Sequence, residues 1–274
     1  MADALGAIGK GLRLGTLVPY LGPEVLRLEK TPPVPSSGRD LACALASRVG
    51  VPARIRANVW SSAQFIETRR HRLTLQRLME AIFAPAVFPN AFHRWLASLH
   101  PPLIVDCWYD DAMALALVEA GVRWGQIQAV TRNGKYEDIW YRFLKPDNAV
   151  ATAAEAGAWE TVLYKPHGAV HPNGEFLLSD SDYVEVLTEI DIQTPIPPPV
   201  IARRTPRGFV FFGCRFRDQM DRIFAKEIAK RSAGPAYAVL AGETSRGEQR
   251  FLEEQRIERI DMPLSEAVRL LIGR

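Results

Sequence analysis

The sequence predicts an α/β protein with a Rossmann-like, mainly parallel sheet that has helices on both faces. Short apolar runs alternate along the chain with stretches that carry apolar residues at helical spacing, and this alternation is typical of parallel sheets. The chain has 274 residues, of which 47% are hydrophobic and 24% are charged, so it is long and apolar enough to bury its own core. We therefore expect a single domain over residues 1–274.

The first strand is expected at residues 15–21, an apolar run that ends at Gly22. A loop rich in proline and serine follows it. Ser37, with Asp40 three residues later, is a capping pattern that predicts the start of a helix. The chain thus passes from a buried strand through a long turn into its first helix.

Residues 55–100 are expected, approximately, to form a helical lobe inserted in the domain. Apolar side chains recur at helical spacing over 57–84, and a basic run at 69–72 divides them into two helices. A third helix is expected at 91–99 and stops at the proline pair that follows.

The middle of the chain predicts three further strands and two helices. Apolar runs at 103–108, 124–130 and 159–165 are typical of buried strands. A helix over 110–120 connects the first two and is closed by a glycine. Another helix begins at Ser179 with acidic residues, which the helix dipole favours at that end.

The last third continues the alternation of strands and helices. A proline-rich stretch at 194–199 is expected to be a loop. Strands are then expected at 208–213, 237–241 and 257–262, with helices between them at 218–231 and 248–255.

Composition excludes several classes of protein. A net charge of +3 is too small to indicate nucleic-acid binding. Three scattered cysteines, Cys43, Cys107 and Cys214, form no CxxC pair, so neither a disulfide framework nor a four-cysteine zinc site is expected. The sequence has no signal-peptide pattern and no apolar run of about 18 residues, so we expect a cytoplasmic protein without a membrane contact.

Four predicted strand ends carry glycine or polar segments, and ligands bind beyond the carboxyl ends of strands in such sheets. The segments read LGPEV at 21–25, DCWYDD at 106–111, KPHG at 165–168 and GCRFRD at 213–218. In this order, and with SDY at 181–183, they resemble the sirtuin-like (silent-information-regulator-like) NAD-binding family. The closer resemblance is to its bacterial branch, which lacks a zinc ribbon, and it spans about residues 12–262.

The resemblance implies NAD as the cofactor and a role for each matching residue. In the family, a glycine-rich turn approaches the pyrophosphate, the histidine of the K-x-H-G motif acts as a base, and the late glycine segment lies against the adenosine half. It therefore implies His167 and Asp110 as catalytic residues. The cofactor-binding residues that it implies are Gly22, Glu24, Trp108, Tyr109, Gly168, Gly213, Arg215 and Asp218.

Three of these positions depart from the family pattern. Glu24 replaces a glycine, and a carboxylate facing the pyrophosphate would repel it unless it points away or is protonated. Trp108 replaces an asparagine, and an indole has one donor and no acceptor, so it cannot imitate a carboxamide. Arg215 replaces a serine, and with Arg217 it either binds an anion or is solvated.

Each candidate also has a purely structural interpretation. His167 would then hydrogen-bond a neighbouring loop, and Asp110 would be one of the charges at a helix N-terminus. Trp108 would plug the pocket instead of stacking on a ring. His171 lies near His167, but two histidines without a third ligand do not make a metal site, so no metal is expected.

The basic cluster in the predicted lobe is expected to be a solvated helix face. Its alternative is a surface for an anionic partner, although nucleic acid is not expected. The cluster consists of Arg69, Arg70, Arg72 and Arg77. The partners that we expect are a nucleotide ligand and a separate effector protein.

Three functions follow from these observations. The first is an NAD hydrolase, since the missing zinc ribbon disfavours a deacylase. The second is a catalytically inactive sirtuin-like protein that acts as a nucleotide sensor or a protein-interaction module. The third is an enzyme for a different nucleotide or sugar-phosphate ligand. A pocket blocked by Trp108 would favour the second, and an open pocket lined by Arg215 and His167 would favour the third.

Overall fold

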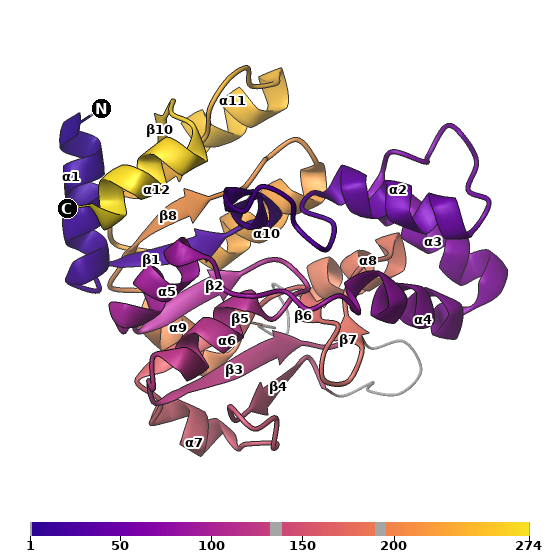
Figure 1. Cartoon of the computed structure of the whole chain (residues 1–274), viewed down its shortest axis with the longest axis horizontal. Helices are drawn as coiled ribbons and strands as arrows, with labels where there is room; N and C mark the ends of the chain where they lie inside the picture. Colours follow the sequence, from indigo (N-terminus) through magenta and orange to yellow (C-terminus); the bar gives the residue numbers. More distant parts are fainter. Residues whose placement is uncertain (1, 132–138, 190–195, 274) are drawn as a thin grey trace.

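An eight-stranded sheet forms the centre of the protein (Figure 1). The structure, a computed structural model, describes residues 2–131, 139–189 and 196–273. The strand order is β10-β9-β8-β1-β2-β5-β3-β4, and among the described strands of this sheet only the β3–β4 pair is antiparallel. The strands are β1 (Leu17–Leu21), β2 (Leu103–Asp106), β3 (Trp124–Ala129), β4 (Tyr141–Leu144), β5 (Thr161–Lys165), β8 (Gly208–Phe212), β9 (Ala236–Val239) and β10 (Ile257–Ile260). The predicted α/β, mainly parallel fold is confirmed.

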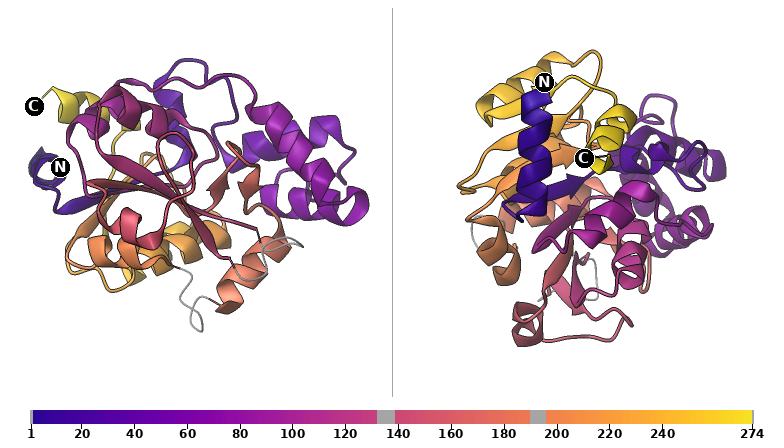
Figure 2. Two further views of the ribbon diagram at one scale, coloured as in Figure 1. Left: turned by 90° about the horizontal axis from the view of Figure 1, so that it is seen from below. Right: turned by 60° about the vertical axis from the view of Figure 1, so that its left-hand side comes forward.

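Helices cover both faces of this sheet (Figure 2). Successive side chains of a strand point to opposite faces, so Val18 and Tyr20 belong to one apolar cluster and Leu17 and Leu21 to the other. One face is covered by α1 (Ala2–Arg13), α5 (Ala91–Ser98), α6 (Ala112–Glu119) and α12 (Leu264–Ile272). The other is covered by α9 (Pro198–Arg204), α10 (Gln219–Ala229) and α11 (Arg246–Glu254).

The helical lobe consists of three helices at one end of the molecule (Figure 1). They are α2 (Gly38–Arg48), α3 (Val59–Arg70) and α4 (Arg72–Phe83), and α8 (Asp180–Glu189) packs beside them. Ser37 caps α2 by accepting a hydrogen bond from the Asp40 amide over 3.1 Å, as its sequence pattern predicts. The lobe differs from the expected range of residues 55–100. It includes α2, which precedes residue 55, and it lacks α5, which packs on α6 instead.

Several elements were not predicted from the sequence. They are α1, β4, α12, a 3-10 helix η1 (Pro23–Leu28), α7 (Ala153–Gly157) and the two-stranded sheet of β6 (Gly168–Ala169) and β7 (Glu175–Phe176). The loop prediction for 194–199 is wrong at its end, where α9 begins at Pro198, and residues 194–195 lie outside the described part. Proline suits the first turn of a helix, because its fixed φ is helical and the missing N–H has no acceptor there.

Candidate functional site

A cavity of about 320 Å³ lies at the carboxyl ends of β1, β2 and β8. β1 lies between β2 and β8, and the chain runs from β1 to β2 on one side and returns to β8 on the other. Such a reversal of strand order is where open α/β sheets bind ligands. The first turn of α2 and the start of α3 line the cavity from the side of the lobe.

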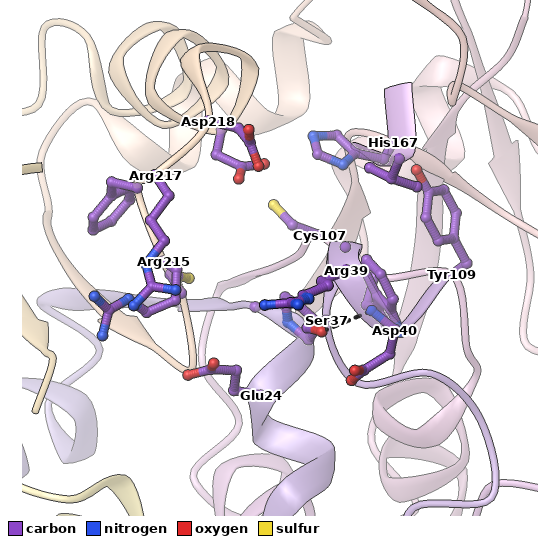
Figure 3. Close-up of a pocket in the computed structure, with 18 of the residues that line it drawn as sticks. Glu24, Ser37, Arg39, Asp40, Cys107, Tyr109, His167, Arg215, Arg217 and Asp218 are labelled. Atoms are coloured by element: carbon purple, nitrogen blue, oxygen red, sulfur yellow. Dashed lines mark hydrogen bonds between the residues drawn. The ribbon is translucent and has the colours of Figure 1, made fainter. Parts of the chain in front are cut away.

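His167 follows β5 and lines this cavity from an aromatic cage (Figure 3). The residue is 5% exposed, and its ring centroid lies 4.8 Å from that of Phe224, 5.7 Å from Tyr183 and 6.1 Å from Trp60. Burial, with a smaller effect of the Lys165 ammonium, lowers the pKa of His167 to about 3. Its Nε2 is buried and has no hydrogen-bond partner among the described residues. The site therefore holds a neutral imidazole that the fold does not use for a loop contact.

An acidic pair on the first turn of α10 lines the cavity as well. Asp218 precedes α10, and Figure 3 shows its carboxylate and the His167 imidazole facing the same hollow from different elements. Asp221 lies one turn further along the helix, and burial together with the Asp218 charge raises its pKa to about 8. Asp221 was not predicted, although its spacing of three residues from Asp218 places both on one helix face.

Trp108 and Tyr109 form part of the cavity wall and leave the cavity open. Trp108 is 5% exposed and donates from Nε1 to the carbonyl oxygen of Pro35 over 2.7 Å. Tyr109 donates from its hydroxyl to the Leu177 carbonyl oxygen over 2.8 Å. The indole therefore anchors the loop before α2, and it neither plugs the pocket nor keeps its single donor for a ligand.

The turn after β1 has no free amide donor between Gly22 and Val25. The Gly22 amide donates to the Phe212 carbonyl over 2.8 Å, that of Glu24 to the Gly213 carbonyl over 3.1 Å, and that of Val25 to the Gly22 carbonyl over 3.2 Å. Pro23 has no N–H. A Cβ atom on Gly22 would lie 2.4 Å from the Gly213 carbonyl oxygen, so this glycine serves the close packing of the β1 and β8 ends.

Charged side chains around this turn are mostly engaged with one another. Glu24 lies 3.4 Å from Arg27, which also pairs with Asp40 at 3.0 Å. Arg215 donates to both oxygens of the buried Glu248 carboxylate, over 3.0 and 3.2 Å. Arg217 is different, because its side chain is 66% exposed and its Nε lies 3.8 Å from Glu248.

The structure does not bring every predicted site residue to the cavity. Seven of the ten line it: Gly22, Glu24, Trp108, Tyr109, His167, Arg215 and Asp218. Asp110 does not, because its carboxylate accepts from the Ala112 amide over 2.9 Å at the start of α6. Gly168 and Gly213 have positive φ angles of 72° and 65° and serve tight backbone turns.

Other lining residues carried no sequence signal. Trp60 reaches the cavity from α3, and Arg39 reaches it from the first turn of α2. Their residue types are common in ordinary helices and strand ends, so only the tertiary arrangement identifies them. In the basic cluster, Arg72 forms ion pairs with Asp182 at 2.6 Å and Glu67 at 3.1 Å, whereas its neighbours are exposed.

The model of the SIR2-like domain family matches residues 102–260, more than half of the chain. The chain belongs to the SIR2-like family. A comparison with curated proteins found no match. The predicted sirtuin-like assignment is therefore confirmed, and it places the chain in a nucleotide-binding family that is generally NAD-related.

This SIR2-like domain does not fit NAD in the manner that the family resemblance implies. The amides that would hold the pyrophosphate already donate to backbone carbonyls, two of them at the end of β8, and Arg215 is held by Glu248. In the described part of the chain, no group of three or more His, Cys, Asp or Glu side chains is arranged to hold a metal ion. None of the helices described there has the length and apolar character that a membrane crossing requires. The effector protein stays a prediction.

Proposed function

We propose that this SIR2-like protein is a nucleotide hydrolase that cleaves the bond between the ribose and the base of its ligand. The observation that carries this proposal is the buried imidazole of His167, which lines an open cavity at the switch point of the sheet and has an unpartnered Nε2 among the described residues. A neutral imidazole that lines a cavity has a free nitrogen lone pair and can accept a proton from water.

The reaction needs one proton acceptor and, for some bases, one proton donor. Water attacks C1′ of the ribose, its proton passes to the His167 imidazole, and the C1′–N bond breaks with its electron pair going to the base. A nicotinamide ring, which is cationic before cleavage, leaves as a neutral molecule and needs no acid. A neutral purine or pyrimidine takes a proton as it leaves, and Asp221, whose pKa of about 8 keeps it protonated at neutral pH, would donate it.

The cavity walls suit such a ligand. Trp60, Trp108 and Tyr109 line the cavity with aromatic surface, on which a flat base can pack.

A second function, a nucleotide sensor without catalysis, is favoured by one observation. The amides of the turn after β1 and the Arg215 guanidinium are already bonded, so the cleavage apparatus of the family is not retained in full.

Turnover of a nucleotide panel separates the two functions. Purified protein is incubated with nucleoside monophosphates, nicotinamide mononucleotide and NAD, and the released base is measured by chromatography. We expect base release that His167→Gln lowers at least about 100-fold, as is usual for loss of a general base. His100→Gln, at an exposed histidine paired with Glu160, is the matched control and keeps full activity. Binding without any base release would support the sensor instead.

A further inference from the structure

We infer that the cavity accepts a mononucleotide, and that a clasp formed by Arg215 and Glu248 excludes the second half of a dinucleotide. The inference deepens the proposed function and rests on it for the identity of the ligand as a nucleotide. The reason is steric: the side chains of Arg215 and Glu248 fill part of the sheet edge where a dinucleotide would otherwise bind.

The clasp covers the carboxyl ends of β8 and β9. Arg215 stands three residues after β8, and its guanidinium also donates to the carbonyl oxygens of Ala241, over 3.2 Å, and Glu243, over 2.9 Å, in the loop that follows β9. With the two bonds to Glu248 in the first turn of α11, one guanidinium joins three segments. Four of its five N–H donors are therefore used within the described residues.

Glu248 is held as firmly as Arg215. The residue is fully buried, and its carboxylate also accepts from the Phe216 amide over 3.2 Å and the Ser245 amide over 2.9 Å. Together with its arginine contacts, these bonds satisfy both oxygens. A charged pair with all its groups bonded does not rearrange readily for a ligand, because each broken bond would leave a buried charge without a partner.

A dinucleotide needs the edge that the clasp occupies. Doubly wound sheets bind the two nucleotide halves on the two sides of the switch point. Here the open cavity with His167 lies over the ends of β1, β2 and β8. Its β9 side is closed by Arg215, which bridges from the turn after β8 to the loop after β9. The cavity volume of about 320 Å³ is at the lower end of the range for ligand pockets, which favours a ligand with one nucleotide unit.

The free positive charge of the cavity fits one phosphate group. Arg39 lines the cavity, and within the described residues its side chain makes no ion pair and no hydrogen bond. Among the described residues, the side chain of Arg217, also in the lining, has only the 3.8 Å ion pair with Glu248. Figure 3 shows both among the labelled side chains around the hollow, from α2 and from the turn before α10. Arginine is the preferred partner of phosphate oxygens, so these two residues are assigned to a monophosphate.

The test compares two probes that share the reacting bond. Nicotinamide mononucleotide and NAD have the same ribose–nicotinamide bond and differ in the adenylate half. By isothermal titration calorimetry, we expect the wild-type protein to bind the mononucleotide at least about tenfold more tightly than NAD. Arg39→Gln with Arg217→Gln should weaken mononucleotide binding about tenfold and leave binding of the phosphate-free riboside unchanged.

Removing the clasp should reduce or abolish the preference for the mononucleotide. Arg215→Ser with Glu248→Gln takes away both charges together, and glutamine keeps one acceptor oxygen for one of the two backbone amides, Ser245 or Phe216. NAD should then bind about tenfold more tightly than to the wild type. If this variant does not fold, the inference is still tested by the wild-type comparison of the two probes and by the Arg39→Gln, Arg217→Gln variant.

Three results are distinguishable. Equal or tighter binding of NAD by the wild type overturns the inference, whether or not either probe is hydrolysed. Absence of binding by nicotinamide, adenine, guanine, cytosine and uracil mononucleotides also overturns it. Selective binding of a mononucleotide without any base release supports the inference and contradicts the proposed function.

Discussion

Lys165 donates from Nζ to Oδ2 of Asp106 over 2.8 Å, and their side chains are only 1% and 8% exposed. The same ammonium donates to the Asp110 carbonyl oxygen over 2.7 Å, and the other Asp106 oxygen accepts from the Trp108 amide over 3.1 Å. These bonds fasten the end of β5, two residues before His167, to the turn after β2 that carries the cavity wall. The ion pair therefore fixes two sides of the candidate site relative to each other.

Breaking this pair from one side should be strongly destabilising. Lys165→Met leaves the Asp106 carboxylate buried without its partner, and we expect a loss of about 3–5 kcal/mol in the free energy of unfolding. Lys165→Met combined with Asp106→Leu leaves no unpaired charge and should recover most of that loss. Urea unfolding followed by circular dichroism measures both. A single variant as stable as the wild type would contradict the structural role of the pair.

Gly22 should tolerate no side chain, for a steric reason. Its φ of −103° is ordinary, but a Cβ would lie 2.4 Å from the Gly213 carbonyl oxygen and 2.8 Å from the Cys214 Sγ. We expect Gly22→Ala to lower the free energy of unfolding by about 1–3 kcal/mol. Gly50→Ala is the matched control, since no atom lies within 4 Å of its added Cβ, and should change stability by less than about 1 kcal/mol. Equal effects of the two changes would show that packing at Gly22 is not tight.

Local patterns were sufficient for most of the sheet and for the helix starts. The apolar runs that became β1, β2, β5 and β8 are buried along their whole length, and the pattern of Ser37 and Asp40 forms the cap of α2. Such signals depend only on residues close together in the chain, so they can be recognised in a single sequence. The position of His167 at the candidate site could also be predicted, because the carboxyl ends of parallel strands meet at one edge of the sheet.

Hydrogen-bond partners far apart in the sequence were beyond this kind of reasoning. Trp108 bonds to Pro35 across 73 residues, and Arg215 bonds to Glu248 across 33. The sequence displays the donors, but the acceptor depends on which loops the fold brings beside them. For the same reason Asp110, whose residue type and motif indicated catalysis, is used to start α6.

The protein should lose stability in mild acid through two buried histidines. Burial lowers the pKa of His93 from 6.5 to about 4 and that of His167 to about 3. The unfolded chain therefore binds more protons than the folded one below pH 6.5, and stability, complete above that pH, falls as the pH decreases toward these folded values. Between pH 6.5 and 5 we expect a loss of about 2 kcal/mol per histidine, measured by urea unfolding at several pH values.

Two substitutions provide the control for this pH dependence. His93→Gln with His167→Gln should flatten the profile between pH 6.5 and 5, since neither replacement titrates. His100→Gln, at a histidine whose side chain is 46% exposed, should leave the profile as in the wild type. An unchanged profile in the first variant would assign the acid sensitivity to other groups.

Asp221 should make the protein less stable as the pH rises. Its pKa is about 8 in the folded protein against an ordinary 3.8, because burial and Asp218 disfavour the charged form. Between these values the folded protein binds the extra proton, so the stability linked to Asp221 is present at low pH and is lost as the pH rises through about 8. After allowance for solvent in the cavity, we expect Asp221→Asn to be about 1–2 kcal/mol more stable than the wild type at pH 9 and nearly equal at pH 4.

Thermal unfolding across this pH range measures the difference in stability between Asp221→Asn and the wild type. Glu29→Gln, at an exposed carboxylate, is the control and should match the wild type. A wild-type profile in Asp221→Asn would show that this carboxyl ionises normally, and it would remove the proton donor assigned to neutral bases.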